Sequence, residues 1–235
     1  MILFLTKIFE KEAYADDFVS GQLYLKSVEY FVELEGDETG RADSHENIVG
    51  SFRPEDVSIQ IGGVEIAGAD LAAPIRYSSP ALLNRYLLCM SAATNGPFEK
   101  LNSDTLPEFR EHLQIPDDSL QMGDWAVLVT NVSEFHERLR AGAMKAEVSL
   151  KTGLVNYRKI NELHGFIPDE DWLFTKDERF AWQREYRAVV NTRRNAEQPQ
   201  DIRLDVGALS DICYKIPTEK LRELEISVQF PDEEE

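Results

Sequence analysis

Apolar positions recur along this chain with a period of two in many short segments and with a helical period in only a few. The alternation is plainest in residues 57–61 and 64–66, which flank Gly62 and Gly63 and therefore predict a tight hairpin. Residues 86–91 are nearly all apolar, which predicts a central strand covered on both faces. Short strands therefore dominate the expected fold.

The remaining elements follow from the same patterns. Helices are predicted for residues 11–20, 27–34, 108–113, 132–142 and 218–224, and strands for residues 2–5, 22–26, 125–130, 185–191, 202–206 and 226–230. A second hairpin is expected to join residues 146–150 to 154–157 through residues 151–153. Since strands and helices do not alternate regularly, the pattern predicts an α+β fold with mixed, mostly antiparallel sheets and short helices.

The length and composition fit one globular domain. The chain has 235 residues, of which 43% are hydrophobic, and we expect a single domain over residues 1–230. Residues 97–123 are interpreted as an insertion, and residues 231–235 as a disordered acidic tail. The longest apolar runs, 1–5 and 86–90, are too short to cross a bilayer, and the N-terminus lacks a signal-peptide pattern. We therefore expect a cytoplasmic protein with no membrane partner.

The net charge of the chain limits the kinds of partner that it can bind. The chain carries 25 basic and 43 acidic residues, a formal net charge of −18, which argues against tight non-specific DNA binding. Residues 176–203 depart from this balance, with seven basic and five acidic residues. This stretch is interpreted either as an exposed strand pair whose charges serve solubility, or as a pocket for an anionic ligand such as a pyrophosphate.

Several chemistries lack their usual sequence pattern. The chain contains no G-x-G-x-x-G turn, no phosphate-binding loop and no nucleophile elbow. Its four histidines have no metal-ligand spacing, so no metal cofactor is expected; they are His45, His112, His136 and His164. Cys89 and Cys213 follow apolar residues and are interpreted as reduced, buried strand residues.

Two polar groups could carry chemistry. Gln183 and Glu185 are two residues apart at the start of a predicted strand, so their side chains are expected to point the same way. An amide and a carboxylate on one face can hold a sugar hydroxyl and stabilise a developing cation, as glycosyl transfer requires. The second group, Arg41, Asp43 and Glu46, is interpreted either as a ligand-facing loop or as a turn whose charges pair with one another.

A family resemblance rests on anchors spread over most of the chain. These are residues 21–24 (GQLY), 41–46 (RADSHE), 87–91 (LLCMS), Lys176 and 182–187 (WQREYR). In this order they resemble an uncharacterised bacterial and phage protein family linked with abortive-infection defence. The last anchor is also similar to the catalytic-glutamate strand of ADP-ribosyltransferases, including their DNA-modifying toxin branch.

The resemblance implies an ADP-ribosyltransferase-like fold and an NAD-dependent activity in phage defence or counter-defence. Glu185 would be the catalytic glutamate and Gln183 its companion, while Ser91 would be the serine of the middle strand. The pyrophosphate of NAD would lie near Arg41 or Arg187, with Asp43 and Glu46 orienting ligand hydroxyls. The acceptor would be a protein or a small molecule.

The alternative hypothesis is a non-enzymatic acidic protein, either a phage or host defence factor or a nucleic-acid mimic, whose surface binds a basic partner. In that case Glu185 and Arg187 would be an ordinary exposed pair on a strand whose apolar residues fill the core.

Overall fold

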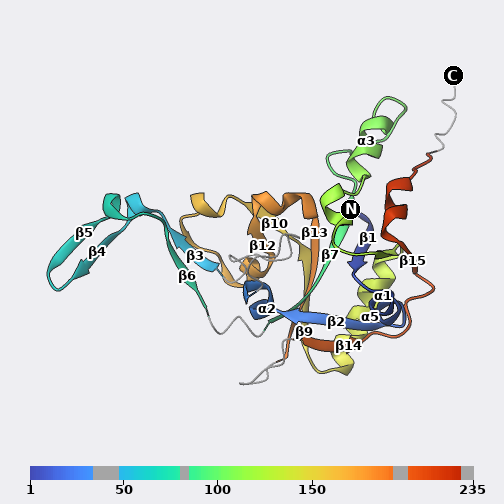
Figure 1. Ribbon diagram of the computed structural model, residues 1–235, viewed down its shortest axis with the longest axis horizontal. Coiled ribbons are helices and arrows are strands. Elements are labelled where there is room, and N and C mark those ends of the chain that lie inside the picture. Colours follow the sequence, from blue (N-terminus) through green and yellow to red (C-terminus); the bar gives the residue numbers. More distant parts are fainter. Residues whose placement is uncertain (34–47, 80–84, 193–200, 229–235) are drawn as a thin grey trace. The chain divides into compact units, whose positions relative to one another are not determined.

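The computed structural model describes residues 1–33, 48–79, 85–192 and 201–228 (Figure 1). The fold is α+β, with mainly antiparallel sheets and short helices, as the pattern predicted. The chain divides into two compact units. Unit 1 comprises Met1–Leu23, Cys89–Ala146 and Arg203–Glu235, and unit 2 comprises Tyr24–Leu88 and Glu147–Ile202. The single domain and the insertion at residues 97–123 stay predictions, and residues 231–235 lie outside the described part.

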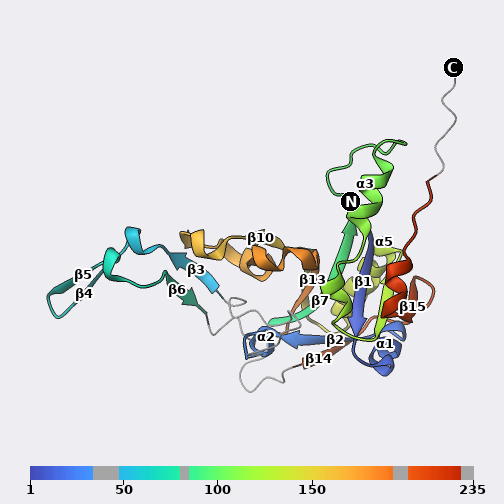
Figure 2. The ribbon, with the colours of Figure 1, turned by 45° about the horizontal axis from the view of Figure 1, so that its top comes forward.

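Unit 1 is built on four antiparallel strands in the order β7-β1-β8-β15, of which β7, β1 and β15 are labelled in Figures 1 and 2. They are β1 (Ile2–Phe9), the second half of β7 (Arg85–Thr94), β8 (Trp125–Val129) and β15 (Cys213–Pro217). Leu5 lies opposite Ala92 on one side and Val129 on the other, and all three side chains are buried. Contacts between these buried apolar side chains on neighbouring strands stabilise the sheet although its strands are short.

Helices complete unit 1. They are α1 (Glu12–Val19), α3 (Leu106–Leu113), α4 (Asp117–Leu120), α5 (Val132–Lys145) and the 3-10 helix η7 (Thr218–Glu223). Phe18 of α1 and Phe135 of α5 are buried with ring centroids 6.1 Å apart. Asn131 caps α5 by accepting a hydrogen bond from the backbone N–H of Glu134. The apolar stripe predicted for residues 132–142 is confirmed, and the helix continues to Lys145.

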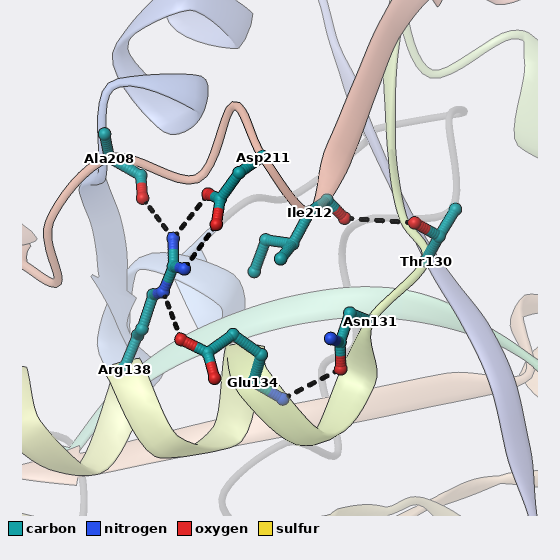
Figure 3. A network of polar contacts seen from close by, with 7 residues as sticks. All are labelled: Thr130, Asn131, Glu134, Arg138, Ala208, Asp211 and Ile212. Atoms are coloured by element: carbon teal, nitrogen blue, oxygen red, sulfur yellow. Dashed lines mark hydrogen bonds and ion pairs between the residues drawn. The ribbon is translucent and has the colours of Figure 1, made fainter.

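An exposed ionic network around Arg138, called here the Arg138 network, ties α5 to the loop before β15 (Figure 3). The guanidinium donates from Nε to Glu134 at 2.8 Å and from Nη1 and Nη2 to Asp211 at 2.7 and 2.6 Å. It also donates to the carbonyl of Ala208. These hydrogen bonds raise the pKa of Arg138 above its usual range, with Asp211 the largest cause, so the guanidinium remains charged throughout the accessible pH range.

Unit 2 contains a second strand arrangement. The first half of β7 pairs with β2 (Gln22–Ser27), and β7 also pairs with β13 (Glu185–Asn191). Strand β13 in turn pairs with β9 (Ser149–Leu154). Three smaller sheets complete this unit. The first has the order β11 (Gly165–Phe166), β3 (Ile48–Phe52), β6 (Ile75–Ser78), and the second is the pair β4 (Ser58–Ile61) and β5 (Val64–Ala67). The third is the parallel pair β10 (Asn156–Arg158) and β12 (Thr175–Asp177). Strand β14 (Asp201–Asp205), of which residues 203–205 belong to unit 1, pairs with β2.

Short helices connect the strands of unit 2. They are α2 (Val28–Glu33), η1 (Pro54–Asp56), η2 (Gly68–Asp70), η4 (Ile160–Glu162), η5 (Asp169–Phe174) and η6 (Glu178–Gln183). The hairpin at Gly62 and Gly63 is confirmed, with φ angles of +59° and +86° that favour glycine. The central strand at residues 86–91 is also confirmed, and it runs on to Thr94.

Two strand predictions are wrong. Residues 151–153 form no turn, because they lie inside β9, where Gly153 is opposite Arg187. A Cβ added to Gly153 would lie only 3.3 Å from the ring of Phe174, so glycine suits this position because the ring packs close to it. Residues 226–228 form no strand. Their segment is held by side chains of unit 1 instead: Arg110 donates to the carbonyl of Ile226 at 2.8 Å, and Gln114 donates to that of Leu224 at 3.4 Å.

The cysteine prediction holds for Cys213, which is buried in β15, and burial raises the pKa of its thiol to about 11. Cys89 lies in β7 and is only half-buried. Within the described ranges, neither cysteine forms a disulfide.

Candidate functional site

The start of β13 carries the candidate chemistry, and a backbone reversal puts it there. The 3-10 helix η6 ends at Gln183, and Arg184 adopts the left-handed conformation, with φ +45° and ψ +48°. The chain then enters β13 at Glu185. Gln183 therefore does not lie on the strand, so the predicted common strand face is wrong. The turn instead brings the two side chains to one ammonium group.

That ammonium belongs to Lys176 in β12. Its Nζ donates to Oε1 of Gln183 at 2.9 Å and to Oε2 of Glu185 at 3.3 Å. An amide and a carboxylate from different elements thus share one cation.

Arg187, two residues along β13, holds the other side of the carboxylate. Its Nε donates to Oε1 of Glu185 at 2.6 Å, and its Nη2 donates to Oε2 at 3.4 Å. Its Nη1 donates to the carbonyl of Leu173 at 2.7 Å. Since Glu185 and Arg187 are two residues apart on a strand, their side chains leave the same face and reach each other without backbone distortion. We call Lys176, Gln183, Glu185 and Arg187 the Glu185 cluster.

Burial distinguishes this cluster from ordinary surface pairs. The exposed fractions are 5% for Lys176, 8% for Gln183, 5% for Glu185 and 1% for Arg187. The interpretation of Glu185 and Arg187 as an exposed pair is therefore wrong. Buried charges are costly to desolvate unless they are paired and hydrogen-bonded, and the two cations provide that compensation for the carboxylate.

Neighbouring groups fix the geometry of the cluster. The hydroxyl of Tyr157 accepts the backbone N–H of Glu185 at 2.8 Å, and the backbone N–H of Val155 donates to the carbonyl of Glu185 at 2.8 Å. The ammonium of Lys176 lies 4.8 Å from the ring centroid of Phe180, within cation–π range. The carboxylate is therefore held at a defined position by both its backbone and its charged partners.

A cavity of about 280 Å³ is lined by residues close to the cluster in sequence. Its lining includes Phe174 and Thr175, which come immediately before Lys176, together with Lys151 and Arg158. No member of the Glu185 cluster lines this cavity. The cavity therefore gives no direct access to the carboxylate of Glu185.

The structure brings together only part of the predicted site. Gln183, Glu185 and Arg187 meet in unit 2, whereas Ser91 belongs to unit 1, where it lies in β7 opposite Thr6 of β1. Arg41, Asp43 and Glu46 lie outside the described residues. Sequence reasoning did not give Lys176 a role in the site, although it served as an anchor of the family resemblance.

Three further findings concern metals, membranes and relatives. In the described ranges, no group of three or more histidine, cysteine or acidic side chains is arranged to hold a metal ion. The helices within those same ranges are all too short or too polar to span a membrane. Comparison with protein-family models, curated proteins and solved structures found no match to this chain.

Proposed function

We propose that this chain binds an NAD-type dinucleotide and transfers ADP-ribose, with Glu185 as the catalytic carboxylate and an ADP-ribosyltransferase-like fold around it. The observation that carries the proposal is the convergence of Gln183 and Glu185 on Lys176 in a site from which water is largely excluded. A preorganised charge in such a site stabilises a transition state more strongly than the same charge in water.

Each residue of the cluster has a part in the proposed reaction. The glycosidic C–N bond of NAD breaks, nicotinamide leaves with the bonding electrons, and positive charge develops on the ribose. Glu185 accepts a hydrogen bond from a ribose hydroxyl and stabilises that charge, while Gln183 holds a second polar group of the substrate. A nucleophile of the acceptor, a protein or a small molecule, then forms the new bond at the same carbon and loses its proton.

Access to the carboxylate is part of the proposal. Glu185 is 5% exposed, so the substrate reaches it only when one of its present contacts opens. The contact with Lys176, at 3.3 Å, is longer than the Nε contact with Arg187, at 2.6 Å. We therefore assign Lys176 to the side that opens, and Arg187 to the side that keeps the carboxylate in place. The biological setting that the family resemblance suggests, phage defence or counter-defence, belongs to this proposal.

One observation favours the alternative, a non-enzymatic acidic protein with a basic partner. Both carboxylate oxygens of Glu185 already contact cations of the chain itself, as expected for a structural ion cluster. Under this alternative, NAD neither binds nor loses nicotinamide.

The test is to incubate the purified chain with NAD, measure nicotinamide release by chromatography, and record the melting temperature with and without NAD. We expect a ligand-dependent rise in melting temperature and a measurable release. Glu185→Gln keeps the side-chain shape and should reduce the release rate by at least about 100-fold, by analogy with the loss of one charge-stabilising group in other active sites.

Controls separate catalysis from folding. Glu162→Gln removes an exposed carboxylate of the same unit, which pairs with Lys159 at 3.2 Å, and should leave the release rate unchanged. Circular dichroism at the assay temperature verifies that each variant is folded. A folded Glu185→Gln variant that releases nicotinamide at the wild-type rate refutes the assignment. Absence of both release and thermal shift in the wild type favours the alternative.

A further inference from the structure

A second cavity, entirely within unit 1, lies where the paired strands β8 and β15 end. Pro217 and Trp125 are directly opposite each other in the ladder, and the backbone N–H of Thr218 donates to the carbonyl of Asp124 at 2.9 Å. The cavity has a volume of about 420 Å³, within the range of small-molecule sites. Its lining consists of Leu120, Gly123, Asp124, Trp125, Pro217, Thr218, Glu219 and Arg222. We call it the Trp125 cavity.

The backbone around the Trp125 cavity leaves little room for its lining to shift. A Cβ added to Gly123 would lie 2.3 Å from the carbonyl oxygen of Phe9, so a larger residue there would displace β1 or the loop before β8. Strand β15 leads directly into η7, the red helix of Figure 1, which supplies Thr218, Glu219 and Arg222. Two strand ends and one helix therefore fix the positions of the lining residues.

The charges at the Trp125 cavity are unbalanced. Asp124 and Glu219 are exposed, and no described residue forms an ion pair with either carboxylate. The cation at the cavity, Arg222, is already paired, since its Nη1 lies 2.7 Å from Oδ1 of Asp117. The lining therefore presents net negative charge beside an indole ring.

A buried hydroxyl gives a second, independent indication of a ligand. Thr218 is 4% exposed, and its Oγ1 has no hydrogen-bond partner among the described residues. Buried polar atoms are nearly always satisfied, and leaving one unsatisfied costs about 1–3 kcal/mol. Oγ1 itself has almost no accessible surface, so a ligand in the cavity can offer the missing partner only after the Thr218 side chain turns about χ1 toward the space that the residue lines.

We propose that the Trp125 cavity binds an organic cation with a guanidinium or ammonium head. Asp124 and Glu219 supply the counter-charge, the indole of Trp125 supplies an aromatic surface, and Thr218 supplies a hydrogen-bonding hydroxyl. Nζ of Lys215 lies 5.1 Å from the ring centroid of the indole, and its charge is compensated by Glu12 and Asp16, so the ligand would use the part of the ring that this ammonium leaves open. The overall charge of −18 adds long-range attraction for a cationic ligand. This site is independent of the Glu185 cluster and of the proposed transfer activity.

The probes for the test are N-acetyl-arginine amide, N-acetyl-lysine amide and, as the anionic counterpart, N-acetyl-glutamate amide. Binding is followed through the indole N–H signal of Trp125 in NMR spectra, assigned with a Trp125→Phe variant. We expect saturable binding of both cationic probes, with the arginine probe tighter because a planar guanidinium stacks on an indole. A short peptide with one central arginine tests whether the cation belongs to a polypeptide or to a small molecule. Tighter binding of the peptide points to a polypeptide partner, and equal binding points to a small molecule.

Variants test the assigned residues. Asp124→Asn and Glu219→Gln should each weaken binding of the arginine probe by about 3- to 10-fold, an effect that high salt reduces. Thr218→Val keeps the side-chain shape, removes the hydroxyl and should weaken binding by a similar factor. Glu223→Gln is the matched control, because it removes one negative charge from the same helix outside the cavity lining, and it should change binding less than 2-fold.

Three results would overturn the proposal. They are the absence of any saturable shift of the Trp125 signal, equal binding of the anionic probe, and folded Asp124→Asn and Glu219→Gln variants that bind the arginine probe as tightly as the wild type does.

Discussion

The Arg138 network and the Glu185 cluster use the same chemistry in opposite surroundings. In each, an arginine donates twice to one carboxylate, with shortest contacts of 2.6 Å. The side chains of Arg138 and Asp211 are 23% and 60% exposed, whereas those of Arg187 and Glu185 are 1% and 5% exposed. Contact geometry is therefore a poor guide to importance, since burial decides what the loss of one partner costs.

The largest difference should come from removal of the buried carboxylate. Glu185→Leu leaves Lys176 and Arg187 buried without their shared acceptor, and we expect a loss of about 3–5 kcal/mol in the free energy of unfolding. Urea unfolding followed by tryptophan fluorescence measures this loss. A loss below about 1 kcal/mol would contradict the burial of the cluster.

The double variant Glu185→Leu with Arg187→Met sharpens the comparison. Replacing a buried ion pair by apolar side chains often costs less than breaking it, so the double variant should be more stable than Glu185→Leu alone. A double variant less stable than the single one would show that the contact of Arg187 with the carbonyl of Leu173 matters more than its charge.

Removal of one cation from the cluster should have an intermediate effect. Lys176→Met deletes the contacts with Gln183 and Glu185 but leaves Arg187 on the carboxylate, so we expect a loss of about 1–3 kcal/mol. The same urea titration measures it. The comparison would fail if Lys176→Met destabilised the protein more than Glu185→Leu does.

The two regions also differ in how far the sequence predicts them. The helix at residues 132–142 was predicted from its apolar period alone, and the structure adds the cap at Asn131. The partner of Arg138, Asp211, is 73 residues away, and no local pattern links them. Long-range pairings of this kind depend on topology, which periodicity does not encode.

The Glu185 cluster was predicted in part, for a similar reason. The strand at residues 185–191 follows from its apolar residues, and Gln183, Glu185 and Arg187 are close in sequence. The left-handed turn at Arg184 and the burial of the charges could not be predicted, because charged residues at strand starts are usually exposed. The wrong hairpin at residues 151–153 has a related cause: Gly153 signals a turn in isolation, but here it makes room for Phe174.

A smaller effect is expected in unit 1. Arg138→Met removes the exposed hydrogen bonds to Asp211 and the carbonyl of Ala208, and the partly buried one to Glu134. We expect a fall of roughly 1–3 °C in melting temperature, which shrinks in 1 M salt because exposed ion pairs are screened. Differential scanning calorimetry at low and high salt measures both. A fall as large as that of Glu185→Leu would remove the contrast between the two regions.

The smallest effect is a pH dependence confined to the Arg138 network. The hydrogen bond from Arg138 lowers the pKa of Asp211 below its usual value of 3.8. A carboxyl group with a lowered native pKa stabilises the fold fully above its ordinary pKa, and this contribution is lost as the pH falls through the native pKa. The difference in melting temperature between the wild type and Asp211→Asn should therefore be constant above about pH 5 and shrink below pH 3.8.

Asp205 does not obscure this measurement, although the hydrogen bond from Lys145 lowers its pKa as well. Both proteins retain Asp205, so its contribution cancels when one melting temperature is subtracted from the other. The Glu185 cluster cancels in the same way, which confines the difference to unit 1. A difference between the wild type and Asp211→Asn that stays constant down to pH 2 would mean that Arg138 does not hold Asp211 in its charged form. The charge of Asp211 would then add nothing to the stability that its contact with Arg138 provides. The Arg138 network would differ from the Glu185 cluster in two respects, the contribution of charge and the degree of burial.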